Sequence, residues 1–153
     1  MDRDEPIGLL IGAVRRRIRQ AIDSRVRHYH LTTQQFWVLV AIYEHPGFSL
    51  GQLAALLRMD LPTASRVVST LTKRKLVQVK GDAADRRRAC LHLRAPGTAL
   101  GHELRDLATA VRAAVVQGLS AGEQEALRSA LRKIVANMDR LQNGDTPRLR
   151  NEL

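Results

Sequence analysis

The fold of this protein is decided by residues 60–94, which read DLPTASRVVSTLTKRKLVQVKGDAADRRRACLHLR. An aspartate followed two positions later by proline is typical of a helix start, because the carboxylate caps a free backbone N–H group and proline lacks one. Apolar residues then recur at helical spacing at Ala64, Val67, Val68 and Leu71. The opposite face of this predicted helix carries proline, small polar and basic side chains: Pro62, Thr63, Ser65, Arg66, Ser69, Thr70 and Lys73.

The remainder of the stretch alternates apolar and polar residues in two runs, 76–80 and 88–94. This alternation predicts a two-stranded hairpin. Its inward side chains are expected to be Val77, Val79, Ala89, Leu91 and Leu93. Cys90 then falls on the outward face, and the tip, residues 81–87, is too polar to be buried.

A short helix is predicted immediately before residue 60. Ser49-Leu50-Gly51-Gln52 has the spacing of a capping box, in which a hydroxyl and an amide satisfy free backbone N–H groups. Thr32-Thr33-Gln34-Gln35 has the same spacing and predicts an earlier helix start, and Ser120-Ala121-Gly122-Glu123 predicts a later one. Two short helices joined by a tight turn are typical of a helix-turn-helix, and the hairpin makes it a winged helix-turn-helix.

Long amphipathic helices are predicted on both sides of this module, because apolar residues recur every three or four positions. Their apolar stripes exceed what the module needs for its own core. Twofold dimers are the commonest oligomers, so we predict a homodimer, with an intramolecular bundle as the alternative. The whole chain, 1–153, is predicted to be one mainly α domain: a winged helix with a two-stranded β-wing at about 31–95, dimerisation helices at about 7–28 and 97–141, and a loose tail at 143–153.

Positive charge is concentrated in the same stretch. The chain has 25 Lys plus Arg against 15 Asp plus Glu, a net charge of +10. Residues 58–94 hold ten basic and three acidic side chains, and therefore +7 of that +10. A compact block of one sign attracts a polyanion, so double-stranded DNA is the predicted partner, with a surface that only confers solubility as the alternative.

Composition and motifs exclude several other classes. We find no Gly-rich phosphate loop, no clustered carboxylate pair and no nucleophile with a plausible base, so the sequence predicts no enzyme and no catalytic residues. The single cysteine excludes an intramolecular disulfide and cannot alone build a zinc site, so neither metal nor cofactor is expected. No apolar run suits a membrane span, and the acidic start differs from a secretory signal, which together predict a cytoplasmic protein.

One ordered set of motifs runs across most of the chain: Leu31-Thr32-x-x-Gln35-Phe36-x-Val38-Leu39, Leu53-Ala54, Thr63-x-Ser65-Arg66-Val67-Val68, Leu76-Val77, Asp85-Arg86-Arg87 and Leu91-x-Leu93. This set resembles the MarR family of transcriptional regulators. The resemblance implies a homodimer that binds a pseudo-palindromic operator, usually as a repressor, and often of its own gene. It also implies release by small aromatic acids, phenols or oxidants. Lys75 departs from the family pattern, which has glycine there, and we expect it to need a left-handed backbone.

The predicted DNA contacts lie on two elements. On the helix from residue 60, Arg66 is the expected base reader, because a guanidinium can bond guanine O6 and N7 together. A phosphate contact or an internal ion pair is its alternative role. Pro62, Thr63, Ser65, Ser69 and Thr70 face the groove, whereas Ser49 and Lys73 suit phosphates. At the hairpin tip, the family motif implies that Arg87 enters the minor groove and that Asp85 holds the tip in shape. It places Arg86 and Arg88 near the DNA backbone.

All five aromatic residues fall within residues 29–48. In the family this region lines an effector pocket, so a small aromatic acid or phenol is the expected ligand. The alternative is that these aromatics simply pack the core. The candidate ligand-binding residues are Arg16, Arg19, His28, Tyr29, His30, Phe36 and Trp37.

Two other functions remain open from the sequence. One is a regulator that responds to oxidation of Cys90, whose thiolate basic neighbours would favour. The other is a nonspecific architectural DNA-binding protein, which would bind an operator and random DNA with similar affinity.

Overall fold

The computed structural model describes residues 5–81 and 89–144. The described elements are α1 (Ile7–Val26), the short 3-10 helix η1 (Arg27–Tyr29), α2 (Thr33–Glu44), α3 (Leu50–Leu57), α4 (Leu61–Lys73), β1 (Val77–Gly81), β2 (Ala89–Leu93), α5 (Ala95–Val116) and α6 (Ala121–Gln142). The strands β1 and β2 are antiparallel. The predicted fold class, a mainly helical winged helix, is confirmed. The chain divides into two compact units, residues 1–115 and 116–153.

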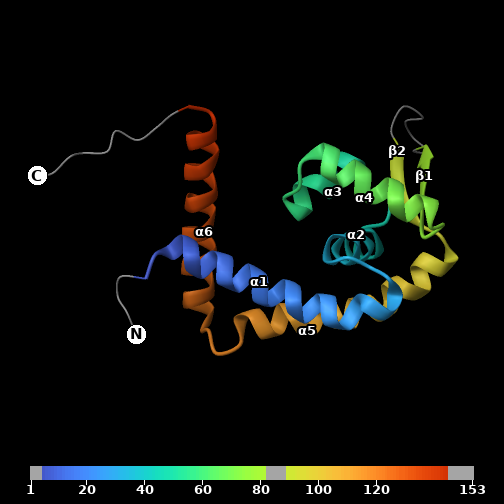
Figure 1. Ribbon diagram of the computed structural model, residues 1–153. Coiled ribbons are helices and arrows are strands. Elements are labelled where there is room, and N and C mark those ends of the chain that lie inside the picture. The colour runs from blue at the N-terminus through green and yellow to red at the C-terminus, as the bar shows by residue number, and fades with distance from the viewer. Residues whose placement is uncertain (1–4, 82–88, 145–153) are drawn as a thin grey trace, which may run out of the picture. The chain divides into compact units, whose positions relative to one another are not determined.

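The core of the first unit surrounds α2. This helix contacts α1, α3, α4 and β2, and Figure 1 shows it between α1 and the pair formed by α3 and α4. Its sequence is apolar on nearly every face, so it has to be covered on all sides. Phe36 and residues 38–42 are accordingly buried. From α4, the four residues predicted to face inward are all buried: Ala64, Val67, Val68 and Leu71.

The helices begin where the sequence predicts. Capping boxes are present at Thr32 with Gln35, at Ser49 with Gln52, and at Ser120 with Glu123. Asp60 caps α4 by accepting the Thr63 N–H at 2.7 Å. A side-chain cap contributes about 1 kcal/mol to helix stability. Local sequence therefore determines at which residues α2, α3, α4 and α6 begin.

The C-terminal end of α4 has a strained turn. The Leu76 N–H donates to Leu71 O at 3.0 Å and the Lys75 N–H donates to Thr72 O at 2.9 Å. This pattern is the Schellman motif, which favours glycine at the position with positive φ. Here that position is Lys75, with a φ of 60°. The expectation that Lys75 leaves the right-handed region is confirmed.

Substitution of Lys75 by glycine is expected to stabilise the protein by about 1 kcal/mol, because glycine takes positive φ without the clash of a Cβ atom. Urea unfolding followed by circular dichroism measures the change. Lys73→Gly is the matched control, because the same substitution inside α4 should cost about 1 kcal/mol. A midpoint for Lys75→Gly below that of the unmodified protein would contradict the strain argument.

The hairpin corrects two parts of the sequence prediction. Val77 and Leu91 are buried as expected, but Val79 is 53% exposed and Ala89 is also exposed. Conversely, Cys90 is only 6% exposed, so the expectation that its thiol faces outward is wrong.

The position of β2 explains both corrections. Backbone bonds join β2 to β1 on one edge and to the Gly47–Phe48 segment on the other: the Gly47 N–H donates to Leu91 O at 2.9 Å and the Leu91 N–H donates to Phe48 O at 2.8 Å. The strand also contacts α2 and α3. Burial along both strands therefore follows closeness to these helices and decreases towards the tip, where Val79 and Ala89 are exposed.

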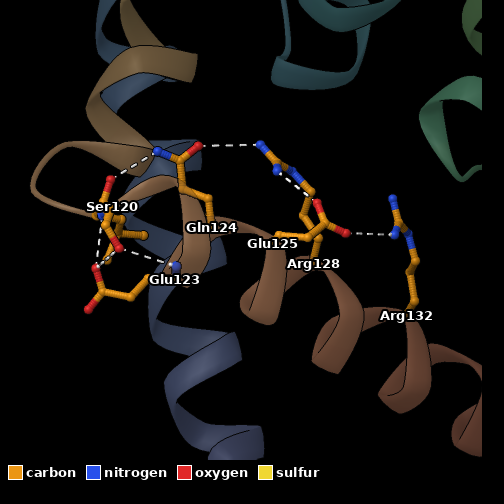
Figure 2. Close-up of polar contacts among 7 residues, drawn as sticks. Ser120, Glu123, Gln124, Glu125, Arg128 and Arg132 are labelled. Carbon is orange, nitrogen blue, oxygen red and sulfur yellow. Dashed lines mark hydrogen bonds and ion pairs between the residues drawn. The ribbon is translucent and has the colours of Figure 1, made fainter.

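The second unit contains α6, an exposed amphipathic helix. None of its residues is buried. Figure 2 shows a polar network on its first turns, in which Arg128 donates to Gln124 and Glu125, and Arg132 pairs with Glu125. Large apolar side chains are exposed farther along it: Leu127, Leu131, Val135, Met138 and Leu141.

Candidate nucleic-acid interface

The outward face of α4 is the centre of the candidate interface. The buried residues of this helix occupy one side, so the other side is turned to solvent. Pro62, Ser65, Arg66, Ser69, Thr70 and Lys73 are exposed, and Thr63 is half-buried. Apart from Arg66 and Lys73 these side chains are short. The helix axis can therefore approach a major groove closely, and the structure brings all seven predicted residues onto one accessible face.

A chain of hydrogen bonds directs the guanidinium of Arg66 towards the first turn of α4. The Arg66 Nη2 donates to Thr63 Oγ1 at 3.2 Å, and the Thr63 hydroxyl donates to Asp60 Oδ2 at 2.9 Å. Recognition helices contact base edges mainly through their N-terminal residues. The guanidinium is therefore oriented before DNA arrives, by a residue that the sequence analysis assigned only to capping.

The charge of Asp60 suits this orienting role. The pKa of Asp60 is lowered, because the carboxylate accepts the Thr63 backbone N–H and the Thr63 hydroxyl, and because Arg66 is nearby. The carboxylate therefore stays ionised and keeps Thr63 aligned towards Arg66. The three-residue spacing from Asp60 to Thr63 and from Thr63 to Arg66 is the sequence signal that identifies this arrangement, since residues three apart are neighbours on a helix.

The other predicted contacts lie at the two ends of the module. Ser49 is half-buried and caps α3: its hydroxyl accepts the Gln52 N–H at 3.2 Å. Asp85, Arg86, Arg87 and Arg88, which the sequence places at the hairpin tip, lie outside the described residues. On either side of them, Lys80, Gly81 and Ala89 are exposed.

The residues predicted to bind an effector do not form one group. Phe36 is fully buried in the core, with its ring 4.8 Å from that of Trp37, as the packing alternative predicts. Trp37 is half-buried. Arg16 and Arg19 are exposed on α1, where Arg19 pairs with Asp23 at 3.3 Å.

The other three predicted residues surround η1. The rings of His28 and Tyr29 lie 3.7 Å apart, and His30 is exposed with a φ of 53°. The Tyr29 hydroxyl donates to Glu103 on α5, and this bond raises the pKa of Tyr29. Tyr29 is thus part of a link between η1 and α5.

A second link between the module and α5 could not be predicted from the sequence. Arg112 donates two hydrogen bonds to the carboxylate of Glu44, at 2.6 and 2.9 Å, and its guanidinium lies 5.7 Å from the centre of the Trp37 ring. The two charged residues are 68 positions apart, so no local pattern could have indicated the pair. These bonds lower the pKa of Glu44.

The Glu44 pair should make stability depend on pH. Because the pKa of Glu44 is lowered in the folded state, the pair stabilises the protein above the usual carboxyl range and is lost as the pH falls through the lowered pKa. We expect Glu44→Gln to cost about 1 kcal/mol at neutral pH, and less as the pH falls below the usual carboxyl range. Urea unfolding at several pH values measures this. A difference from the unmodified protein that does not shrink in acid would exclude the ion pair as its cause.

An apolar groove of about 620 Å³ lies between α1 and α5. None of the seven candidate effector residues lines it. Its lining is apolar apart from two arginines: Ala13, Val14, Arg17, Ile18, Ala21, Arg25, Leu107, Ala110, Val111, Ala114 and Val115.

The described part of the chain shows neither a metal cluster nor a membrane span. Within residues 5–81 and 89–144, no three His, Cys, Asp or Glu side chains are grouped so that they could hold a metal ion. No helix in those ranges has the length and apolarity needed to cross a bilayer.

Comparison with known proteins identifies relatives of this architecture. Residues 30–88 match the sequence model of the MarR family. The HTH-type transcriptional repressor NicR of Pseudomonas putida is 29% identical over 134 residues, which cover 88% of this chain and 85% of NicR.

Two solved structures are similar over most of their length. BpsR of Bordetella bronchiseptica, solved to explain regulation of its DNA binding by 6-hydroxynicotinic acid, is 29% identical with a TM-score of 0.69, over 88% of this chain and 96% of BpsR. MepR of S. aureus in complex with DNA has a TM-score of 0.74 at 24% identity, over 88% of this chain and 99% of MepR.

Proposed function

Because this chain belongs to the MarR family of DNA-binding transcriptional regulators, which are not enzymes, we propose that it is a repressor that binds a pseudo-palindromic operator as a homodimer. The observation that carries this proposal is the exposed face of α4, on which Arg66 is oriented through Thr63 by Asp60. In this proposal residues 31–95 contact DNA, and residues 7–28 and 97–141 form the dimer. Because such an operator lies on the bacterial chromosome, this proposal implies that the protein acts in the cytoplasm.

Unpaired apolar surfaces support the dimer. Exposed apolar side chains gather on α1, at Ile7, Leu9, Leu10, Ile11 and Val14, and the groove between α1 and α5 is almost entirely apolar. A monomer rarely leaves this much contiguous apolar surface in water. In a twofold dimer the same surface of each protomer covers the other. Light scattering coupled to size exclusion measures the mass, and a monomer at micromolar concentration would contradict the proposal.

The test of the DNA proposal is a specificity ratio. Titration with the DNA upstream of the protein's own gene, against a random duplex of equal length, should give affinities that differ by about 10³ or more. Similar affinities would favour an architectural protein. Both affinities should fall steeply with salt, because basic residues that contact phosphates release counterions.

The wing supplies a further prediction. Substitution of Arg87 by alanine should weaken operator binding about tenfold or more, because a guanidinium in a narrow minor groove is attracted by its enhanced negative potential and the dimer carries two wings. The dimer should remain folded. Fluorescence anisotropy at fixed salt measures the loss, with Arg15→Ala, an exposed arginine of α1, as the charge-matched control. An unchanged affinity would remove the wing from the mechanism.

We further propose a small aromatic acid as the effector. Support comes from BpsR, whose DNA binding is regulated by 6-hydroxynicotinic acid. The burial of Cys90 removes the exposed thiol that an oxidation sensor requires. A ligand at 100 times its Kd adds about 2.7 kcal/mol, which raises Tm by several degrees. Heating scans with 6-hydroxynicotinate, nicotinate and salicylate test this, and no shift with any of them would exclude this ligand class.

A further inference from the structure

Arg74, the residue that follows α4, is bonded to a distant segment of the chain. Its Nη1 donates to His30 O at 2.8 Å and its Nη2 donates to Tyr29 O at 2.9 Å. The two acceptors are consecutive carbonyl groups at the end of η1, 44 and 45 positions away in the sequence. Arg74 therefore fastens the end of α4, the proposed recognition helix, to the segment that joins α1 to α2.

The backbone of η1 is shaped for this contact. His30 has a φ of 53° and a ψ of 41°, so the chain turns sharply immediately after the 3-10 helix. The carbonyl groups at the end of a helix carry a partial negative charge, which favours a cation there. A guanidinium has a planar fork of donors that can bond two acceptors at once, whereas an ammonium acts as a point charge. The two bonds therefore restrain the orientation of the Arg74 guanidinium relative to η1, as well as its distance from η1.

The same segment is fastened to α5. Tyr29, whose carbonyl accepts from Arg74, donates its hydroxyl proton to Glu103. Three elements, α4, η1 and α5, are thus joined through one residue. In the proposed dimer α5 belongs to the dimerisation helices, so these bonds relate the recognition helix to the frame that sets the distance between the two half-sites.

Resting on the proposed function, we propose that Arg74 is a positioning residue that fixes α4 against η1 and thereby selects the half-site spacing of the operator. It restrains the angle at which α4 enters the major groove. Two recognition helices held rigidly fit half-sites at one separation, about one helical turn. Without this restraint, α4 of each protomer can shift to a half-site displaced by one base pair. The protein then discriminates less well between operators of different half-site spacing.

The experiment measures affinity for three operators. One has the half-site separation that binds best, the second has a separation one base pair shorter, and the third has a separation one base pair longer. Arg74→Lys and Arg74→Gln are the variants. Both should reduce the affinity ratio between the best and the altered spacings at least threefold. Arg74→Lys should bind random DNA within twofold of the unmodified protein, with the same salt dependence, because it keeps the charge.

Other roles for Arg74 give different outcomes. If Arg74 contacts phosphate instead, Arg74→Lys keeps the spacing ratio and only Arg74→Gln weakens all DNA equally, which overturns the proposal. If it serves only stability, both variants lose specific and random binding in proportion to the unfolded fraction, which also overturns it. Tyr29→Phe leaves both carbonyl acceptors in place and breaks the bond to Glu103, so it should lower the same ratio; an unchanged ratio in all three variants overturns the proposal.

The proposed function can fail separately. If the unmodified protein shows no preference for any operator over random DNA, the operator proposal itself is wrong. If it discriminates between spacings and the variants discriminate equally well, only the role of Arg74 is wrong.

Discussion

Arg66→Ala is expected to lower operator affinity by about 30-fold or more while leaving binding to random DNA within a few-fold. A bidentate contact from arginine to guanine is worth about 1 to 3 kcal/mol, and a twofold dimer makes it twice. The guanidinium is already held through Thr63 by Asp60, so little ordering cost offsets the contact. Anisotropy titrations with operator and random duplexes at one salt concentration measure both affinities.

Three variants test the origin of the Arg66 effect. Arg66→Lys keeps the charge but lacks the fork, so it should lose most of the specific affinity. Thr63→Val removes the hydroxyl that connects Asp60 to Arg66, and should weaken operator binding less than Arg66→Ala. Arg15→Ala removes a charge from α1 and should change neither affinity by more than about twofold. Equal losses on operator and random DNA for Arg66→Ala would identify Arg66 as a phosphate contact.

Gly97→Ala should destabilise the protein by about 3 kcal/mol, a large share of the 5 to 15 kcal/mol by which domains of this size are stable. Gly97 is buried in the first turn of α5, and a Cβ atom there would lie 2.1 Å from Leu76 O and 2.9 Å from its carbonyl carbon. These atoms are backbone and cannot rotate away. The same oxygen accepts the Arg94 N–H at 2.9 Å, so movement of Leu76 also breaks that bond.

Other glycines provide matched controls in urea unfolding experiments. Gly122 in α6 has no atom within 4 Å of its would-be Cβ, so Gly122→Ala should be neutral or stabilising by up to about 1 kcal/mol. Gly101→Ala should fall between the two, because it meets the Tyr43 side chain, which can move more easily than backbone. A cost for Gly97→Ala no greater than that for Gly122→Ala would contradict a clash between the Cβ atom and Leu76.

Most of the fold could be predicted from local sequence. The capping boxes at Thr32, Ser49 and Ser120 place three helix starts, and the periodicity of α4 separates its buried and exposed faces without error. These features depend on residues three or four positions apart, which a helix always brings together. The candidate DNA face follows directly, since it is what remains when the buried residues of α4 are removed.

The hairpin and the effector region were predicted less well, because side-chain burial in both depends on tertiary packing. Alternation assumes a strand with one covered face along its whole length, yet β2 packs against α2 and α3, so Cys90 and Leu91 are both buried while Ala89 next to the tip is exposed. Likewise Phe36 and Trp37 are adjacent aromatics in the sequence, but only the packing of α2 decides that Phe36 is enclosed in the core.

The sequence by itself determined the helix-turn-helix, its wing and the basic face, because capping, periodicity and charge act between near neighbours in the chain. Only the tertiary structure decided that Arg74 bonds the carbonyl groups of Tyr29 and His30, that Arg112 pairs with Glu44, and that Gly97 lies against Leu76. Each of those contacts joins elements brought together by burial of the core around α2. Burial is a property of the whole packed chain, so no local stretch of sequence contains it.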